Sequence, residues 1–289
     1  MSELTASEIA AVSPRSAAPR LPSVRPALLL LQTLAVPLAI LLIWELSGRL
    51  GWIARGILPS PSAVAQGWWQ WAFGHDGMGL NAYSGTWLAN VAFSTKRVSQ
   101  GYGLAILVGV PLGVLIGWSP VVARLVDPTV QALRPVPITA WLPFSIAIFG
   151  ISAFGAIFLI ALGAFYPIVV NSAHGARDVN RNLVRAASMM GASPIQMLLR
   201  VVLPSALPSI CTGLRIGLGI AWTAVIVAEM IAVNDGLGYR ILEAREFFWS
   251  DKIIAGMISI GLLGLLLDTL VSRLSDHLLR WHRGMETGS

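Results

Sequence analysis

The segment from Arg185 to Pro204, RAASMMGASPIQMLLRVVLP, carries the signals of two short helices joined by a bend. Asp178 can cap a first helix over residues 179–190, and Gly191 stands where a left-handed residue would end it. Ser193 can cap a second helix, with Pro194 at its first position. These signals predict a helix–turn–helix within the loop 176–205.

The second helix of this loop is expected to have an apolar stripe, because Ile195, Leu198, Leu199 and Val202 recur at i, i+3, i+4 and i+7. Pro204 and Pro208 are expected to interrupt the helical pattern where the next apolar stretch begins. Such a stripe needs a cover, which the protein's own spans or a partner could provide. Small and adaptable side chains surround the bend and suit a projection that seats in another protein's groove: Ala186, Ala187, Met189 and Met190.

The rest of the chain has the composition of an integral membrane protein. Of 289 residues, 55% are hydrophobic and 12% are charged, against about 25% charged in soluble domains. A span needs about 20 mostly apolar residues, and the candidate spans are 27–48, 98–118, 136–152, 154–173, 206–233 and 253–273. The third is short and contains Pro137 and Pro143. The alternation required by a membrane β-barrel is absent.

These segments predict an all-α membrane protein, a polytopic bundle of about six transmembrane helices over residues 26–283. Residues 1–25 are Ala/Ser/Pro-rich and are expected to form a disordered cytoplasmic tail, with a short C-terminal tail at 284–289. Residues 58–77, LPSPSAVAQGWWQWAFGHDG, are predicted to form an interfacial helix that starts at Pro61, with a plain loop as the alternative.

The distribution of basic residues predicts that both termini are cytoplasmic. With six spans and an inside N-terminus, twelve arginines are inside (Arg15, Arg20, Arg25, Arg124, Arg134, Arg177, Arg181, Arg185, Arg200, Arg273, Arg280, Arg283) and five basic residues are outside (Arg49, Arg55, Arg240, Arg245, Lys252). An excess of Lys and Arg marks cytoplasmic loops. The same spread explains the net charge of +6 without nucleic acid as a partner.

Small residues recur every four positions in the second span, at Gly101, Ala105, Gly109, Gly113 and Gly117, with a shorter series at Gly213 and Gly217 in the fifth. Such stripes let two helices approach closely in lipid. We expect ordinary helix packing inside the bundle. An interface between two subunits is the alternative.

Charged residues inside spans are costly and are expected to face the interior, to pair or to reach toward the interface. Arg215 and Glu229 lie in the fifth span, about 21 Å apart along a straight helix, so they cannot pair with each other. Arg215 could line a route for an anion; an internal ion pair is the alternative. Glu229 could line the same route, act as a gate, or hold helices together.

The sequence contains no recognisable motif for catalysis, nucleotide binding or metal binding. His174 and Asp178 are four residues apart, but two ligands are too few for a metal site. The chain contains no G-x-x-x-x-G-K-[ST] sequence to bind ATP phosphates and no G-x-S-x-G or zincin motif. The chain is therefore not expected to be an enzyme or to bind a cofactor or a metal.

The loop resembles the cytoplasmic loop of permeases of bacterial ABC importers. That motif reads Glu-Ala-Ala, three residues, Gly, nine residues, Ile-x-Leu-Pro; here Arg185-Ala186-Ala187, Gly191 and Val201-Val202-Leu203-Pro204 stand at the same spacing. Val201 in place of Ile is conservative. Arg185 in place of Glu reverses a charge, so an ion pair of that Glu is not carried over. Over residues 40–283, the sequence looks like permeases for nitrate, sulfonates and taurine.

The resemblance implies a fold like that of type I ABC importer permeases, in the bacterial inner membrane, with a cytoplasmic coupling helix pair. It implies a homodimer in lipid that works with two ABC ATPase subunits, which bind ATP and Mg, and with a periplasmic solute-binding protein. The cargo would be a small anion: an aliphatic sulfonate, ahead of taurine or nitrate. The implied ATPase-docking residues are Arg185, Ala186, Ala187, Met189, Met190, Gly191, Ala192, Ser193, Pro194, Leu203 and Pro204. A secondary transporter that works without an ATPase is the alternative, although no convincing internal repeat supports it.

Overall fold

The computed structural model describes residues 26–52, 57–74 and 83–279, with side chains from residue 34 onward. The expected tails at 1–25 and 284–289 lie outside these ranges. The helices are α1 (Pro26–Arg49), α2 (Pro61–Phe73), α3 (Trp87–Trp118), α4 (Pro120–Leu133), the 3₁₀ helix η1 (Ile138–Trp141), α5 (Leu142–Phe149), α6 (Ala153–Arg177), α7 (Arg181–Met189), α8 (Pro194–Met197), the π-helical segment η2 (Leu198–Val202), α9 (Leu203–Ala232), α10 (Leu237–Glu246) and α11 (Ser250–Leu278). The all-α prediction is confirmed.

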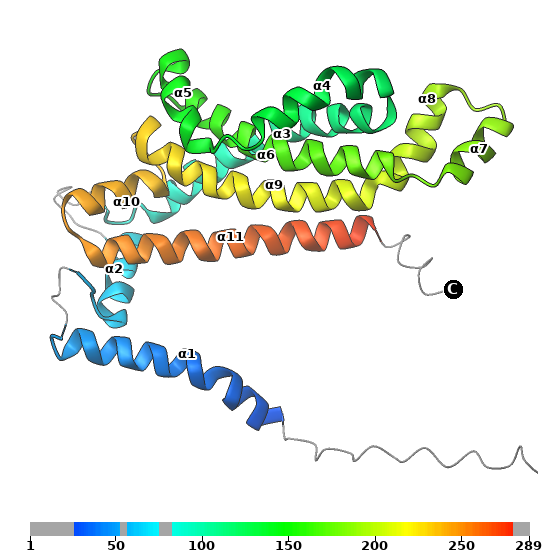
Figure 1. The fold of residues 1–289 in the computed structure, drawn as a ribbon. Helices are drawn as coiled ribbons and strands as arrows, with labels where there is room; N and C mark the ends of the chain where they lie inside the picture. Colours follow the sequence, from blue (N-terminus) through cyan, green and yellow to red (C-terminus); the bar gives the residue numbers. More distant parts are fainter. Residues whose placement is uncertain (1–25, 53–56, 75–82, 280–289) are drawn as a thin grey trace, which may run out of the picture.

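Helix α6 is the centre of the bundle, with α3 packed on one side and α9 on the other (Figure 1). The small residues make this possible. A Cβ added to Gly113 would lie 2.5 Å from the carbonyl oxygen of Val169, and one added to Gly217 would lie 2.9 Å from a side-chain carbon of Ile168. The stripe of small residues on α3 therefore faces α6 of the same chain. If the stripe formed an interface between two subunits, it would lie open in the single chain.

Among the described residues, four helices are long and apolar enough to cross a membrane: α3, α6, α11 and the continuous helix from Pro194 to Ala232. A bent pair of helices makes a fifth span when the two are counted as one. Helix α1 covers the predicted first span, 27–48, with 24 residues. The number of long apolar helices in the described residues is thus close to the six predicted spans.

The third span differs from the prediction. In place of one helix over 136–152, helix α4 is followed by η1 and α5 at an angle of 95°. The break is at Arg134-Pro135-Val136-Pro137, since a proline disfavours helical backbone in the residue before it and donates no hydrogen bond. Helix α4 was not predicted as part of this span, because Arg124, Asp127 and Pro128 make its segment less apolar than a typical span.

The entry to the fifth span also differs. We expected Pro204 and Pro208 to interrupt the helix, but α8, η2 and α9 form one continuous helix. The residues just before Pro204 adopt the wider π-helical turn. A π-turn inside an α-helix absorbs a local break in the hydrogen-bond ladder, so the proline is accommodated without ending the helix.

Helix α2 connects the periphery to the bundle. Ser60 caps it and Pro61 is its first residue, as predicted. The indole nitrogens of Trp68, on α2, and Trp87, at the start of α3, both donate to the hydroxyl of Ser259 on α11, at 3.2 and 3.0 Å. Helix α1 contacts α2 and otherwise lies apart from the bundle (Figure 1).

Candidate functional site

The loop between α6 and α9 is a helix–turn–helix at one end of the bundle (Figure 1). Gly191 has a φ of +78°, the left-handed conformation predicted for it. Ser193 forms a full capping box with Gln196, and Pro194 follows it. The prediction that Asp178 caps the first helix was wrong: Asn180 caps α7 by accepting from the amide of Asn182 at 2.9 Å. Two caps and one glycine make the bend a defined structure.

The tip of the loop is apolar and exposed. Met189 and Met190 are 90% and 82% exposed. The loop is held from inside by Ala187, Met197 and Val202, which are buried. The predicted stripe is only partly correct, because Ile195 and Leu199 point outward, at 70% and 56% exposed.

The residues implied for ATPase docking fall into three groups. The exposed group at the tip comprises Arg185, Ala186, Met189, Met190, Gly191, Ser193 and Pro194. Ala187 is buried and Ala192 is half-buried, so both support the tip. Leu203 and Pro204 begin α9 and are half-buried at the base of the loop.

One side of the loop, along α7 and the end of α6, is strongly basic. Arg177, Arg181 and Arg185 line one cavity together with Trp118. Arg177 donates to Asp127 on α4 at 2.8 Å. Within the described part of the chain, Arg181 and Arg185 have no carboxylate partner.

Arg215 is not the lone guanidinium that its place in an apolar span suggested. Its Nε and one terminal nitrogen donate to the two carboxylate oxygens of Asp268 on α11, both at 2.7 Å. This bidentate pair neutralises the charge and joins α9 to α11. The observation supports the internal ion pair considered for Arg215.

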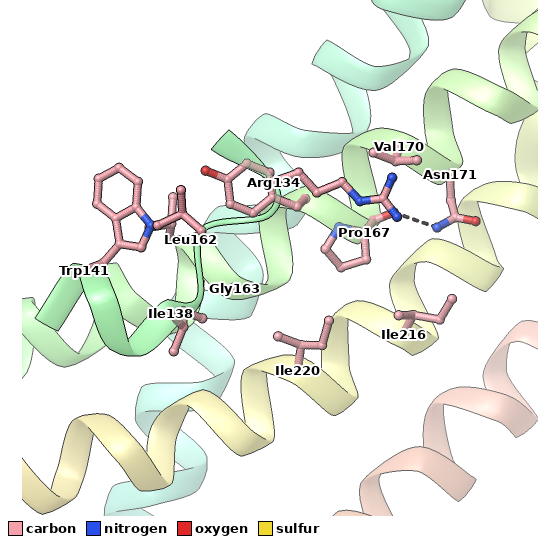
Figure 2. A pocket seen from close by; sticks show the side chains of 12 residues that line it. Arg134, Ile138, Trp141, Leu162, Gly163, Pro167, Val170, Asn171, Ile216 and Ile220 are labelled. Carbon is pink, nitrogen blue, oxygen red and sulfur yellow. Dashed lines mark hydrogen bonds between the residues drawn. The ribbon is translucent and has the colours of Figure 1, made fainter. Parts of the chain in front are cut away.

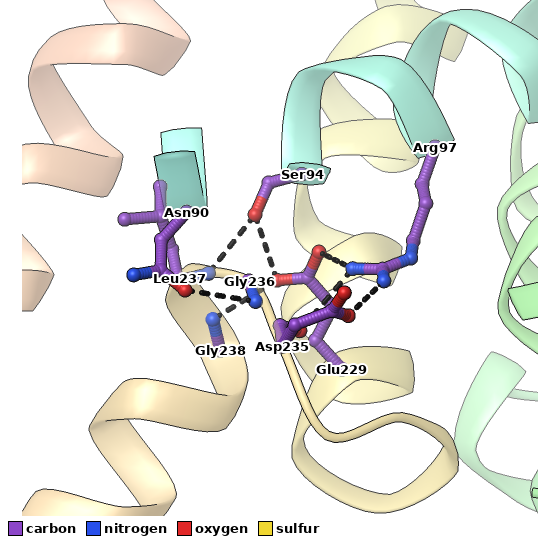
Figure 3. Close-up of polar contacts among 8 residues, drawn as sticks. All are labelled: Asn90, Ser94, Arg97, Glu229, Asp235, Gly236, Leu237 and Gly238. Carbon is purple, nitrogen blue, oxygen red and sulfur yellow. Dashed lines mark hydrogen bonds and ion pairs between the residues drawn. The ribbon is translucent and has the colours of Figure 1, made fainter. Parts of the chain in front are cut away.

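Glu229 lies at the centre of a buried polar network that joins α3 to α9 and to the turn before α10 (Figure 3). Its carboxylate is fully buried and accepts from Ser94 at 2.8 Å, Arg97 at 2.8 Å and the amide of Gly238 at 3.0 Å. Arg97 also pairs with Asp235. Each oxygen of the carboxylate therefore has a donor, which is the arrangement a buried charge requires.

Three residues of α3 belong to this network and were not predicted as partners of Glu229: Asn90, Ser94 and Arg97. Ser94 accepts from the amide of Leu237 at 3.0 Å, and Asn90 accepts from the amide of Gly236 at 3.1 Å. Asn90, Ser94 and Arg97 stand at i, i+4 and i+7 on one face of α3. This polar spacing in an apolar helix was the signal that could have predicted a buried partner for Glu229.

Residues that could form a metal site are not clustered: across 26–52, 57–74 and 83–279, no group of three or more His, Cys, Asp or Glu side chains could hold an ion. The features that remain are an exposed loop with capped helices, a close-packed helical core and charges that are paired between helices.

Comparison with known proteins agrees with this arrangement. Residues 109–284 match the family described as binding-protein-dependent transport system inner membrane component. The taurine transport system permease protein TauC of Escherichia coli K12 is 36% identical over 91% of this chain and 93% of its own length. SsuC of the same organism, whose name assigns it to aliphatic sulfonate transport, is 38% identical over 86% of this chain and 90% of its own.

Two further similarities extend the comparison. The nitrate import permease protein NrtB of Leptolyngbya laminosa is 38% identical over 65% of this chain and 68% of its own. A solved chain of the inward-facing MetNI methionine ABC transporter has the same fold, with a TM-score of 0.56 at 21% identity, covering 67% of this chain and 94% of that chain. From the family match and the extent of these identities, we conclude that the chain belongs to the family of inner membrane components of binding-protein-dependent transport systems.

Proposed function

We propose that this chain is the permease subunit of an ATP-driven importer for a small anion, in the class of aliphatic sulfonates, taurine and nitrate. The names of three relatives support this cargo class. The ATP would be hydrolysed, with Mg, on two copies of a separate ATPase subunit. A second permease copy and a periplasmic solute-binding protein would complete the assembly, with the loop end of the bundle and both termini in the cytoplasm.

The observation that carries the proposal is the exposed tip at Met189 and Met190. Two flexible apolar side chains on a capped, rigid bend suit insertion into a groove of a partner, where methionine adapts to the partner's surface. The groove that receives this loop should also carry acidic residues, because Arg181 and Arg185 present unpaired positive charge beside it.

We assign Arg215 and Glu229 to holding helices together rather than to contact with the cargo. Each already has its opposite charge, at 2.7 Å and 2.8 Å. An anion would have to compete with Asp268 for Arg215, and Glu229 would repel it.

The test of this function is the Gly191→Val variant of the assembled transporter in proteoliposomes. A β-branched residue is disfavoured at a φ of +78°, so the two short helices should tilt. We expect ATP hydrolysis to continue while ATP-driven uptake falls by about tenfold or more. The control is Gly51→Val, which imposes the same strain at a φ of +72° outside the loop and also has open space around it.

An equal ratio of uptake to ATP hydrolysis in the two variants would contradict the proposal that the loop docks the ATPase. Uptake by this chain alone, without an ATPase, would support a secondary transporter.

A further inference from the structure

A cavity of about 360 Å³ lies beside the break between α4 and η1, against α6 and α9. This volume is within the range of small-molecule pockets, about 300–1,000 Å³. The cavity lies halfway along the two central helices, because Pro167 and Asn171 on α6 and Ile216 and Ile220 on α9 line it. A molecule crossing the membrane along α6 and α9 would pass this level.

Arg134 lines this cavity and carries its positive charge (Figure 2). It is the last residue before Pro135, so the proline break that ends α4 also holds the guanidinium at this level. Within the described ranges, Arg134 has no ion pair or side-chain hydrogen bond. By its place in this cavity, Arg134 lies at mid-depth and not in a cytoplasmic loop, where the count of basic residues had placed it. Its side chain is exposed in the single chain, and an unpaired arginine at this depth is costly in a membrane protein and points to a functional site.

Two other arginines on membrane-spanning helices have acidic partners. Arg97 is paired with Glu229 and Asp235, and Arg215 is paired with Asp268. The cavity itself has no acidic side chain in its lining. An anion entering it would therefore meet positive charge without competition from a carboxylate.

Asn171 lies at the same end of the cavity as the guanidinium of Arg134, and Trp141 lies at the other end (Figure 2). The indole nitrogen of Trp141 is fully buried, so it does not face the open space of the cavity. Asn171 adds an amide, one hydrogen of which donates to the carbonyl of Pro167 at 2.8 Å.

Apart from Tyr166, which carries a hydroxyl, the remaining wall of the cavity is apolar. Leu162, Val170, Ile216 and Ile220 line it, and the isoleucines stand on α9 facing the arginine across the cavity (Figure 2). Such a surface binds a hydrocarbon group and offers nothing to a small, fully hydrated ion. The lining therefore combines a cation and N–H donors with a hydrocarbon surface.

We propose that this cavity is a binding site for an organic anion with an aliphatic chain, whose head group is held by Arg134 beside Asn171 and whose chain lies on Ile216 and Ile220. This inference rests on the proposed function and narrows it. Of the cargoes named for the relatives, an alkanesulfonate has both parts and no other charge, taurine adds an ammonium group for which the lining has no carboxylate, and nitrate lacks the hydrocarbon.

The first experiment measures binding to the full-length chain in lipid nanodiscs by isothermal titration with methanesulfonate, butanesulfonate, hexanesulfonate and nitrate. We expect affinity to rise with chain length, by up to about fourfold for each buried methylene, and nitrate to bind most weakly. Arg134→Gln should weaken butanesulfonate binding at least tenfold, and Arg134→Lys should weaken it less.

The matched control is Arg124→Gln, which removes an exposed arginine from α4, the helix that Arg134 follows, at a position away from the cavity. It should bind as the native chain does. Equal binding by the native chain and Arg134→Gln would overturn the proposal, as would no binding of any sulfonate. Nitrate binding as tight as butanesulfonate would overturn the role of the apolar wall.

The second experiment separates this inference from the proposed function. ATP-driven butanesulfonate uptake is measured for the complete transporter with the native chain or Arg134→Gln, after both are shown to elute identically on size exclusion. ATP-driven uptake with an unchanged KM and kcat in Arg134→Gln would overturn the site and leave the function standing. Sulfonate binding that depends on Arg134, without any ATP-driven uptake, would overturn the proposed function and leave the site standing.

Discussion

Replacing Glu229 by glutamine tests whether the polar network between α3, α9 and α10 holds these elements together. Glu229 is fully buried, and its two oxygens accept three hydrogen bonds, from Ser94, Arg97 and the amide of Gly238. An amide has one oxygen and one NH₂ group. In either orientation of the glutamine, the NH₂ group would face a donor that the carboxylate now satisfies.

The size of the effect follows from the charge that is left behind. Removing one partner of a buried ion pair costs about 3–5 kcal/mol. Arg97 keeps its contact with Asp235, so we expect the lower end, about 3 kcal/mol, which is roughly a hundredfold in the unfolding equilibrium. The assay is equilibrium unfolding by sodium dodecyl sulfate in mixed micelles, followed by circular dichroism.

Two further variants make the test specific. Glu243→Gln makes the same change in the partly exposed pair with Arg240 on α10 and should cost no more than about 1 kcal/mol. The double variant Arg97→Met, Glu229→Gln should lose less than the sum of its single variants, because the two side chains share one network. A loss for Glu229→Gln as small as that for Glu243→Gln, or additive losses in the double variant, would refute this reasoning.

Two other predictions concern the packing of the bundle. Gly113→Leu should lower the free energy of unfolding by about 1–3 kcal/mol in the same assay, because its Cβ would lie 2.5 Å from the oxygen of Val169, whereas Gly103→Leu on the open side of α3 should change little; equal losses would contradict close α3–α6 packing. Ser259→Ala removes the acceptor shared by Trp68 and Trp87 and should destabilise the chain by about 1–3 kcal/mol, with a red shift of tryptophan fluorescence as α2 loosens; an unchanged spectrum and midpoint would refute the role of Ser259.

Local features of the fold could be predicted from the sequence. The left-handed Gly191, the capping Ser193 and the start of α2 at Pro61 depend on residues close together in the chain, and the structure confirms each of them. The apolar spans are confirmed in approximate number, with the third broken into a bent pair. The spacing of the small residues on α3 likewise indicated a close helix contact. The backbone hydrogen bonds and steric limits that decide these features act over one or two turns.

Which residues meet across the bundle was decided only by the tertiary structure. Glu229 meets Arg97, 132 positions earlier, and Arg215 meets Asp268, 53 positions later; no local pattern encodes either pair. The 95° break that places Arg134 beside Asn171 also depends on α6 packing against both halves of the bent span. The sequence by itself determined helices, caps and the exposed bend, because those depend on short-range geometry. The pairing of charges depended on how the helices cross, which is set by the packing of the whole bundle.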